Sequence, residues 1–192
     1  MSTQYINTQG VDRSKLDALS LHRFLTGYPL TTKTFTQIDS NLRVYWHTLF
    51  DLCPGLLKLD GPDGMNMFRG FIKMACAQNL PLDWTLHASF YRWLLGSEFA
   101  AKVTAEHLEA VMMAVASLWC SNDTTSKVGI VLAHQHSPVV VLGWKTKGHK
   151  VSSTLDVLEP EGLVVPKKDF GCLTLTQYRF ARPSGFKPLP RR

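Results

Sequence analysis

Two histidines separated by one residue are the nearest approach to a metal-binding pair in this sequence. His134 and His136 follow an apolar run, and residues i and i+2 of a β-strand lie on one side, so both imidazoles could reach one metal ion. No third ligand lies close by, and the adjacent Ser137-Pro138 is typical of a turn. We interpret the pair as the polar turn of a hairpin, and we predict no metal site and no cofactor.

The four cysteines are widely spaced and form no C-x-x-C motif: Cys53, Cys76, Cys120 and Cys172. A Cys-His nucleophile pair stays open, because its members need to meet only in space. Three of the four lie in apolar helical patterns, however, where a thiol is inert packing. The glycines at 61 and 64 lack the Lys-Ser/Thr of a phosphate-binding loop. We therefore predict buried free thiols in a reducing compartment and a protein that is not an enzyme.

Basic residues at the C-terminal end are the stronger functional candidates. Residues 143–192 carry 10 Lys and Arg against 4 Asp and Glu, whereas residues 1–142 carry 11 of each, so the whole net charge of +6 comes from the last quarter. Such asymmetry favours an anionic partner, either nucleic acid or an acidic lipid surface. A solvated basic tail that aids solubility would give the same charge distribution. The candidate binding residues are Lys145, Lys147, Lys150, Lys167, Lys168, Arg179, Arg182, Lys187, Arg191 and Arg192.

The central stretch, 104–144, must position these side chains. Apolar residues recur at helical spacing from Thr104, a good N-cap, to Trp119. Two nearly unbroken apolar runs, 128–133 and 139–144, then flank the histidines. They predict a hairpin that is buried on most of both faces.

The remaining pattern predicts an α+β fold, with an N-terminal helical part packed on a C-terminal antiparallel sheet. We expect an edge strand over 31–38 and helices from Asp39 or Ser40 to Cys53 and over 65–78. Residues 84–95 fit a strand or a helix, and Gly96, a natural C-cap, favours the helix. Further strands are expected at 151–158, 163–165 and 171–180. We divide the chain into a mainly helical part (1–125), a β part sharing its core (126–181) and a flexible basic tail (182–192).

Composition also bears on location. No apolar run approaches the ~20 residues that span a bilayer, and residues 1–11 lack the basic and apolar regions of a signal peptide. We therefore expect a cytoplasmic protein.

One segment resembles a known family. The helix sequence LRVYWHTLFDL from Leu42, the second helix MFRGFIKMACAQNLP from Met67 and the Phe90-Tyr-Arg-Trp93 segment are similar to the middle of rhabdovirus matrix proteins. The resemblance implies a self-associating structural protein of the virion that binds ribonucleoprotein and an anionic membrane. The alternative hypothesis, from charge alone, is a nucleic-acid-binding accessory or regulatory protein of a mobile element.

Overall fold

The structure, a computed structural model, describes residues 33–61, 63–146, 153–159, 166, 169–179 and 185–189, with α2 side chains described from Leu42 onward. The helical elements come first along the chain: α2 (Lys33–Leu52), the 3-10 helix η2 (Pro54–Leu59), α3 (Met65–Ala77), α4 (Leu86–Leu95), the 3-10 helix η3 (Ala100–Lys102) and α5 (Ala105–Asn122). No helix among the described residues is long and apolar enough to cross a membrane.

A five-stranded antiparallel sheet follows, in the order β3-β2-β1-β4-β5. Its strands are β1 (Gly129–His134), β2 (Val140–Lys145), β3 (Ser153–Leu158), β4 (Phe170–Leu175) and β5 (Lys187–Pro188). The hairpin of β1 and β2 lies at the centre, and every residue of β1 is buried, as the two apolar runs predict. The α+β class, with helices followed by an antiparallel sheet, is therefore confirmed.

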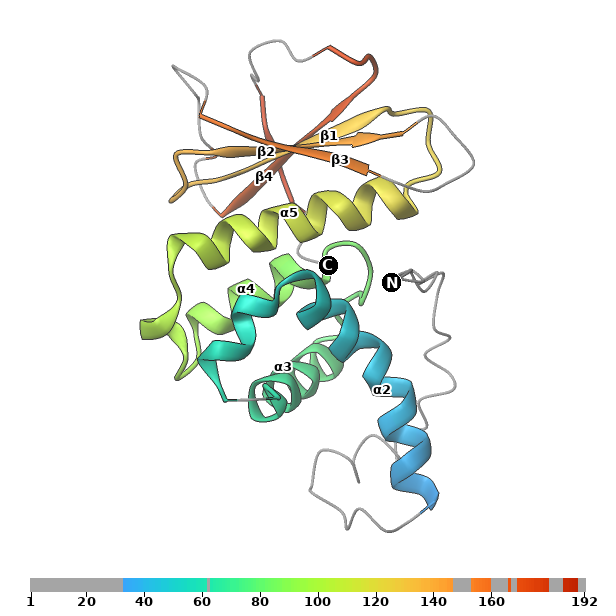
Figure 1. The fold of residues 1–192 in the computed structure, drawn as a ribbon, viewed down its shortest axis with the longest axis vertical. Helices are drawn as coiled ribbons and strands as arrows, with labels where there is room; N and C mark the ends of the chain where they lie inside the picture. The colour runs from blue at the N-terminus through green and yellow to red at the C-terminus, as the bar shows by residue number, and fades with distance from the viewer. Residues whose placement is uncertain are drawn as a thin grey trace.

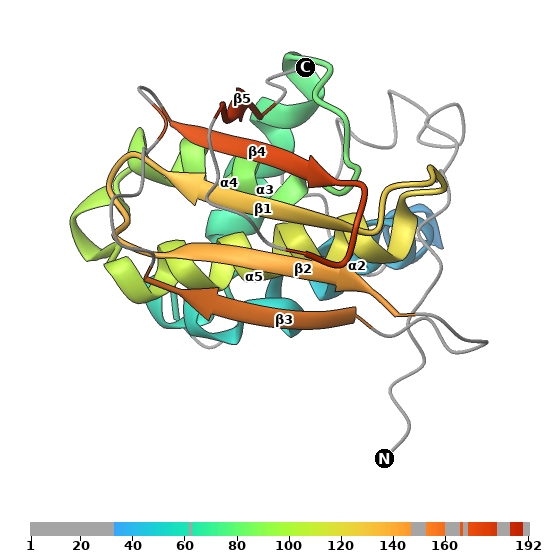
Figure 2. The same ribbon diagram turned by 90° about the horizontal axis from the view of Figure 1, so that it is seen from above.

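Helix α5 joins the two parts. It lies along one face of the sheet, and α2, α3 and α4 lie beyond it, on the side of α5 that faces away from the sheet (Figure 1). Figure 2 shows the sheet from the face that carries no helix among the described residues. At its N-terminus the Thr104 N–H donates to Nδ1 of His107 (3.1 Å), which satisfies a backbone donor that the helix itself cannot pair. Close contact with β2 is possible because residue 143 is a glycine, whose added Cβ would lie 3.0 Å from Cys120 Sγ.

One buried cluster includes side chains from the helices and from the inner face of the sheet, such as Phe71, Phe90, Val115 and Val141. A second, smaller cluster covers the opposite face of the central strands and contains Val131, Ala133, Val140 and Leu142. Burial on both faces explains why the two central strands are almost continuously apolar.

The predicted edge strand at 31–38 is wrong where the structure describes it, because residues from Lys33 onward belong to α2. Asp39 and Ser40 accordingly lie inside the helix rather than at its start. The β-branched threonines misled the prediction. Propensity is a weak term, and extending an existing helix costs little once its buried stripe of Leu42, Tyr45 and Leu49 has formed it.

The C-terminal segment also differs from expectation. The last predicted strand, 171–180, is shorter in the structure, since β4 ends at Leu175. Residues 187–188, inside the range expected to form a flexible tail (182–192), pair with β4 as β5, and Leu189 is buried. Its N–H donates to the Phe170 carbonyl (3.0 Å). Leu189 is a single apolar residue between two prolines and close to two arginines, so the sequence gave little indication that it is buried. The expected strand at 163–165 lies outside the described residues.

Candidate functional site

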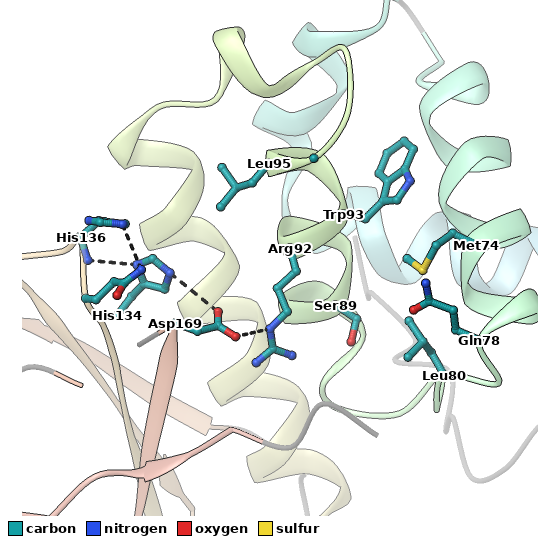
Figure 3. Close-up of a pocket in the computed structure, with 12 residues that line it drawn as sticks. Met74, Gln78, Leu80, Ser89, Arg92, Trp93, Leu95, His134, His136 and Asp169 are labelled. Carbon is teal, nitrogen blue, oxygen red and sulfur yellow. Dashed lines mark hydrogen bonds and ion pairs between the residues drawn. The ribbon is translucent and has the colours of Figure 1, made fainter. Parts of the chain in front are cut away.

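A pocket of about 600 Å³ opens where α3 and α4 meet the β1–β2 hairpin and the residue that precedes β4 (Figure 3). We call it the α4–hairpin pocket. Its polar side chains come from both halves of the chain, and its apolar side chains come from the helical half. It is lined by Met74, Gln78, Leu80, Ser89, Arg92, Trp93, Leu95, Gly96, His134, Gln135, His136 and Asp169.

His134 lies at the base of the hairpin turn, as the last residue of β1, paired with Phe170 of β4. Its side chain is only 2% exposed and makes edge contacts with the rings of Tyr91 and Phe170. Its Nδ1 accepts a hydrogen bond from the His136 backbone N–H (3.2 Å). The neutral imidazole therefore carries its proton on Nε2, which lies 3.9 Å from Oδ1 of Asp169.

Asp169 connects three elements of the fold. Its Oδ2 accepts a 2.6 Å hydrogen bond from Nε of Arg92 on α4, and its carbonyl accepts the Gln135 N–H at 3.3 Å. A second guanidinium nitrogen of Arg92 donates to the Leu189 carbonyl (3.4 Å). Asp169 has a φ of 57°, in the left-handed region that aspartate tolerates better than most residues. The ion pair thus holds the helical part, the sheet and the C-terminal segment together.

The charges around His134 oppose one another. Burial lowers its pKa below the ordinary value, the Asp169 carboxylate acts in the opposite direction, and His136 and Arg92 lower it further. His134 is therefore neutral at pH 7. The Arg92–Asp169 pair next to it has no net charge. The floor of the pocket, by which we mean His134, Arg92 and Asp169, is therefore polar but carries no net charge.

The walls of the pocket differ in character. Trp93, Met74 and Leu80 are partly buried, and Leu95 is 46% exposed at the mouth, so one side presents apolar surface. The hydroxyl of Ser89 and the amides of Gln78 and Gln135 supply hydrogen-bonding groups on the other parts of the lining. Such a lining suits a ligand with an apolar body and a polar, uncharged part.

The predicted hairpin turn at His134 and His136 is confirmed, but sequence reasoning missed its partners. Exposed His136 has its Nε2 within 3.0 Å of the Gln135 amide nitrogen, and the structure brings Arg92 and Asp169 beside His134 from distant positions. The only signal in the sequence for these partners is that Arg92 and Asp169 carry opposite charges; no pattern places either of them beside His134. Among the described residues, no group of three or more His, Cys, Asp or Glu side chains is placed to hold a metal ion.

Three of the ten basic candidates lie among the described residues: Lys145, Arg179 and Lys187. Lys145 donates to Asp123 Oδ2 (2.6 Å) and to the Thr125 carbonyl (3.0 Å), and its amine lies over the Trp119 ring, so it is a structural residue that fastens the end of α5 to β2. Arg179 and Lys187 are exposed. The other seven lie outside the described residues: Lys147, Lys150, Lys167, Lys168, Arg182, Arg191 and Arg192. Their role as binding residues stays a prediction.

The cysteines are free thiols; Cys53 and Cys120 are buried, whereas Cys76 and Cys172 are partly exposed. Burial raises the pKa of both Cys53 and Cys120 to about 12, and it raises the pKa of Cys172 as well. A thiol with a raised pKa is a poor nucleophile at neutral pH.

The chain was compared with models of protein families. Residues 25–190 match the family model described as "Methanobactin biosynthesis cassette protein MbnC-like". No curated protein sequence matches the chain.

This match overturns several expectations. The resemblance to rhabdovirus matrix proteins covered about a quarter of the chain, on helical apolar patterns that many unrelated core helices share, whereas the family model covers almost all of it. The matrix-type structural role, its place in the virion and the alternative of a nucleic-acid-binding accessory protein are therefore wrong. The basic C-terminal residues misled the interpretation, because a charge excess alone does not identify a partner.

Proposed function

The chain belongs to the MbnC-like family of methanobactin biosynthesis cassette proteins, and we propose that within such a cassette it is a binding component that holds a reactant in the α4–hairpin pocket. The observation that carries the proposal is the floor of this pocket. There Arg92 and Asp169 pair with each other, Arg92 also donates to the Leu189 carbonyl, and His134 accepts the His136 backbone N–H, so the positions of all three side chains are fixed before a ligand arrives.

A binding role is favoured over a catalytic one by the state of the reactive groups. The Cys53 and Cys120 thiols have raised pKa values and do not line the pocket. Nδ1 of His134, the lone pair that a general base needs, already accepts the His136 N–H. Asp169 is paired with Arg92. The polar groups of the floor therefore shape the pocket and do not supply an evident nucleophile or base.

Acid–base catalysis by His136 is the second candidate. This imidazole is exposed at the mouth of the pocket, with its ring centroid 5.5 Å from that of His134 and its Nε2 3.0 Å from the amide nitrogen of Gln135. A catalytic His136 would make His136→Gln nearly inactive while leaving reactant binding intact, whereas a binding pocket predicts that this variant keeps turnover within a few-fold.

The experiment is a reconstitution of the cassette from purified proteins, with product followed by mass spectrometry. We expect product formation to fall at least about tenfold when this chain is omitted, because a reactant that is held in place reacts faster than one that must be captured in each encounter. We also expect the chain alone to convert no reactant. Undiminished product without the chain, or conversion by the chain alone, would overturn the proposal.

A further inference from the structure

We propose that His134 makes the α4–hairpin pocket sensitive to pH: when its imidazole gains a proton, it releases the hairpin turn and competes with Arg92 for Asp169. This inference rests on the proposed binding function, since it concerns the regulation of the same pocket. The supporting observation is the position of His134, whose ring lies between the hairpin turn, at the His136 N–H, and the Asp169 carboxylate that pairs with Arg92 (Figure 3).

In the neutral state His134 stabilises the turn. Its Nδ1 accepts the backbone N–H of His136 at 3.2 Å, and its carbonyl accepts the Ser137 N–H at 3.0 Å. The next residue, Gln135, donates its N–H to the Asp169 carbonyl (3.3 Å). The side chains of Gln135 and His136 line the mouth of the pocket. The shape of this mouth therefore depends on a hydrogen bond that only a neutral His134 can accept.

Protonation must change that bond. Nε2 already carries the proton of the neutral ring, so a second proton goes to Nδ1 and turns the acceptor into a donor. Two N–H groups then face each other, so this part-buried hydrogen bond is lost. The His136 backbone must move away, and the Gln135 and His136 side chains move with it.

The other groups around the ring determine where the new charge goes. From the segment before β4, the Asp169 carboxylate attracts it across 3.9 Å; from α4, the Arg92 guanidinium repels it, and so does His136 when charged. Tyr91 of α4 and Phe170 of β4 contribute ring contacts. The imidazolium is therefore drawn towards Asp169, whose Oδ2 already accepts the 2.6 Å bond from Arg92. One carboxylate then serves two cations, and the floor gains one positive charge.

The direction of the pH effect follows from these surroundings. Burial and the neighbouring cations hold the pKa of His134 below the ordinary histidine value. The change therefore occurs in the mildly acidic range, below about pH 6.5, and the pocket keeps its neutral form at and above pH 7.

The test is an NMR titration of the intact, unliganded chain from pH 7.5 to pH 5, following histidine side-chain nitrogens, backbone amides and the Nε–H of Arg92. We expect His134 to be the Nε2–H tautomer at pH 7.5. We also expect the His136 amide and the Arg92 Nε–H to shift with the same midpoint as the His134 ring. Asp169→Asn should lower that midpoint by about 1 pH unit, because the favourable charge is lost.

His134→Asn supplies the decisive variant, since its Oδ1 can accept the His136 N–H in place of Nδ1 but does not titrate. The shifts of the His136 amide and the Arg92 Nε–H should then disappear, while His47→Asn, which alters an exposed histidine of α2, should leave them unchanged. Shifts that persist in His134→Asn would overturn the inference, as would a His134 ring that titrates without them. Because the titration uses no reactant, its outcome is independent of the reconstitution that tests the proposed function.

Discussion

Two buried imidazoles in this protein face different surroundings. His134 has a carboxylate 3.9 Å away, whereas His87, fully buried on α4, has backbone partners at Leu49, whose carbonyl lies 3.2 Å from Nε2, and at Thr48, and no partner for Nδ1. Burial lowers the pKa of His87 from 6.5 to about 4, against a smaller opposite effect of its backbone hydrogen bonds. Burial lowers the pKa of both imidazoles, but only for His134 does a neighbouring carboxylate, Asp169, act in the opposite direction.

His87 should make the protein sensitive to acid. Its pKa is lower in the folded than in the unfolded chain, so the unfolded chain binds the extra proton and stability falls as the pH drops from about 6.5 to about 4. Over that range the contribution is about 3 kcal/mol. His87→Gln keeps a donor for Leu49 but does not titrate, and denaturant unfolding at pH 7 and pH 4 should show that it loses about 3 kcal/mol less than the wild type. Equal losses in the two proteins would contradict this assignment.

At the scale of elements, the sequence was informative wherever a buried face repeats regularly. The 65–78 and 104–119 patterns correspond to α3 and α5, the 84–95 segment proved to be a helix ended by Gly96, and the paired apolar runs correspond to β1 and β2. The regular burial of one side determines such patterns. The N-terminal half of α2 and the two-residue β5 carry no such repeat, and the predictions there failed.

The packing of α5 on β2 can be tested at Gly143. A Cβ at this position would lie 3.0 Å from Cys120 Sγ and 3.1 Å from Ala116 Cβ, so Gly143→Ala must push the helix away from the strand. We expect a loss of about 1–3 kcal/mol in the free energy of unfolding. Gly96→Ala is the matched control, since its nearest contact would be an ordinary 3.7 Å, and it should change stability by less than about 0.5 kcal/mol. If Gly143→Ala were as stable as this control, the close contact of α5 with β2 would be wrong.

For the whole molecule, the C-terminal segment connects the sheet to the helical part. Leu189 is 1% exposed within the main cluster, and its carbonyl accepts a bond from Arg92. Leu189→Ala should therefore lower the free energy of unfolding by about 2–3 kcal/mol. Leu95→Ala, at a 46% exposed position, should have little effect. Thermal and denaturant unfolding of the two variants would measure the difference, and a stable Leu189→Ala would show that the segment is not part of the folded core.

The candidate site could be predicted only in part, for reasons that also concern the whole molecule. The pairing of His134 and His136 in a hairpin turn follows from local pattern, and that part was predicted correctly. Arg92 and Asp169 are 77 residues apart and meet only because α4 packs on α5 beneath the sheet. No local pattern in one sequence records such a contact. The basic C-terminal residues, by contrast, were conspicuous locally, but the sequence did not show that Lys145 pairs with Asp123.

The most direct test of the proposed function fills the α4–hairpin pocket without altering its floor. Gly96 lines the pocket with a φ of −100° and room for a Cβ, so Gly96→Leu should fold normally and occupy the mouth. Ala101→Leu adds a leucine at an exposed position of η3 that does not line the pocket. In the reconstituted cassette we predict that Gly96→Leu lowers the rate of product formation at least about tenfold, by about 1.4 kcal/mol, while Ala101→Leu matches the wild type. A folded Gly96→Leu protein with wild-type activity would show that the pocket does not hold the reactant.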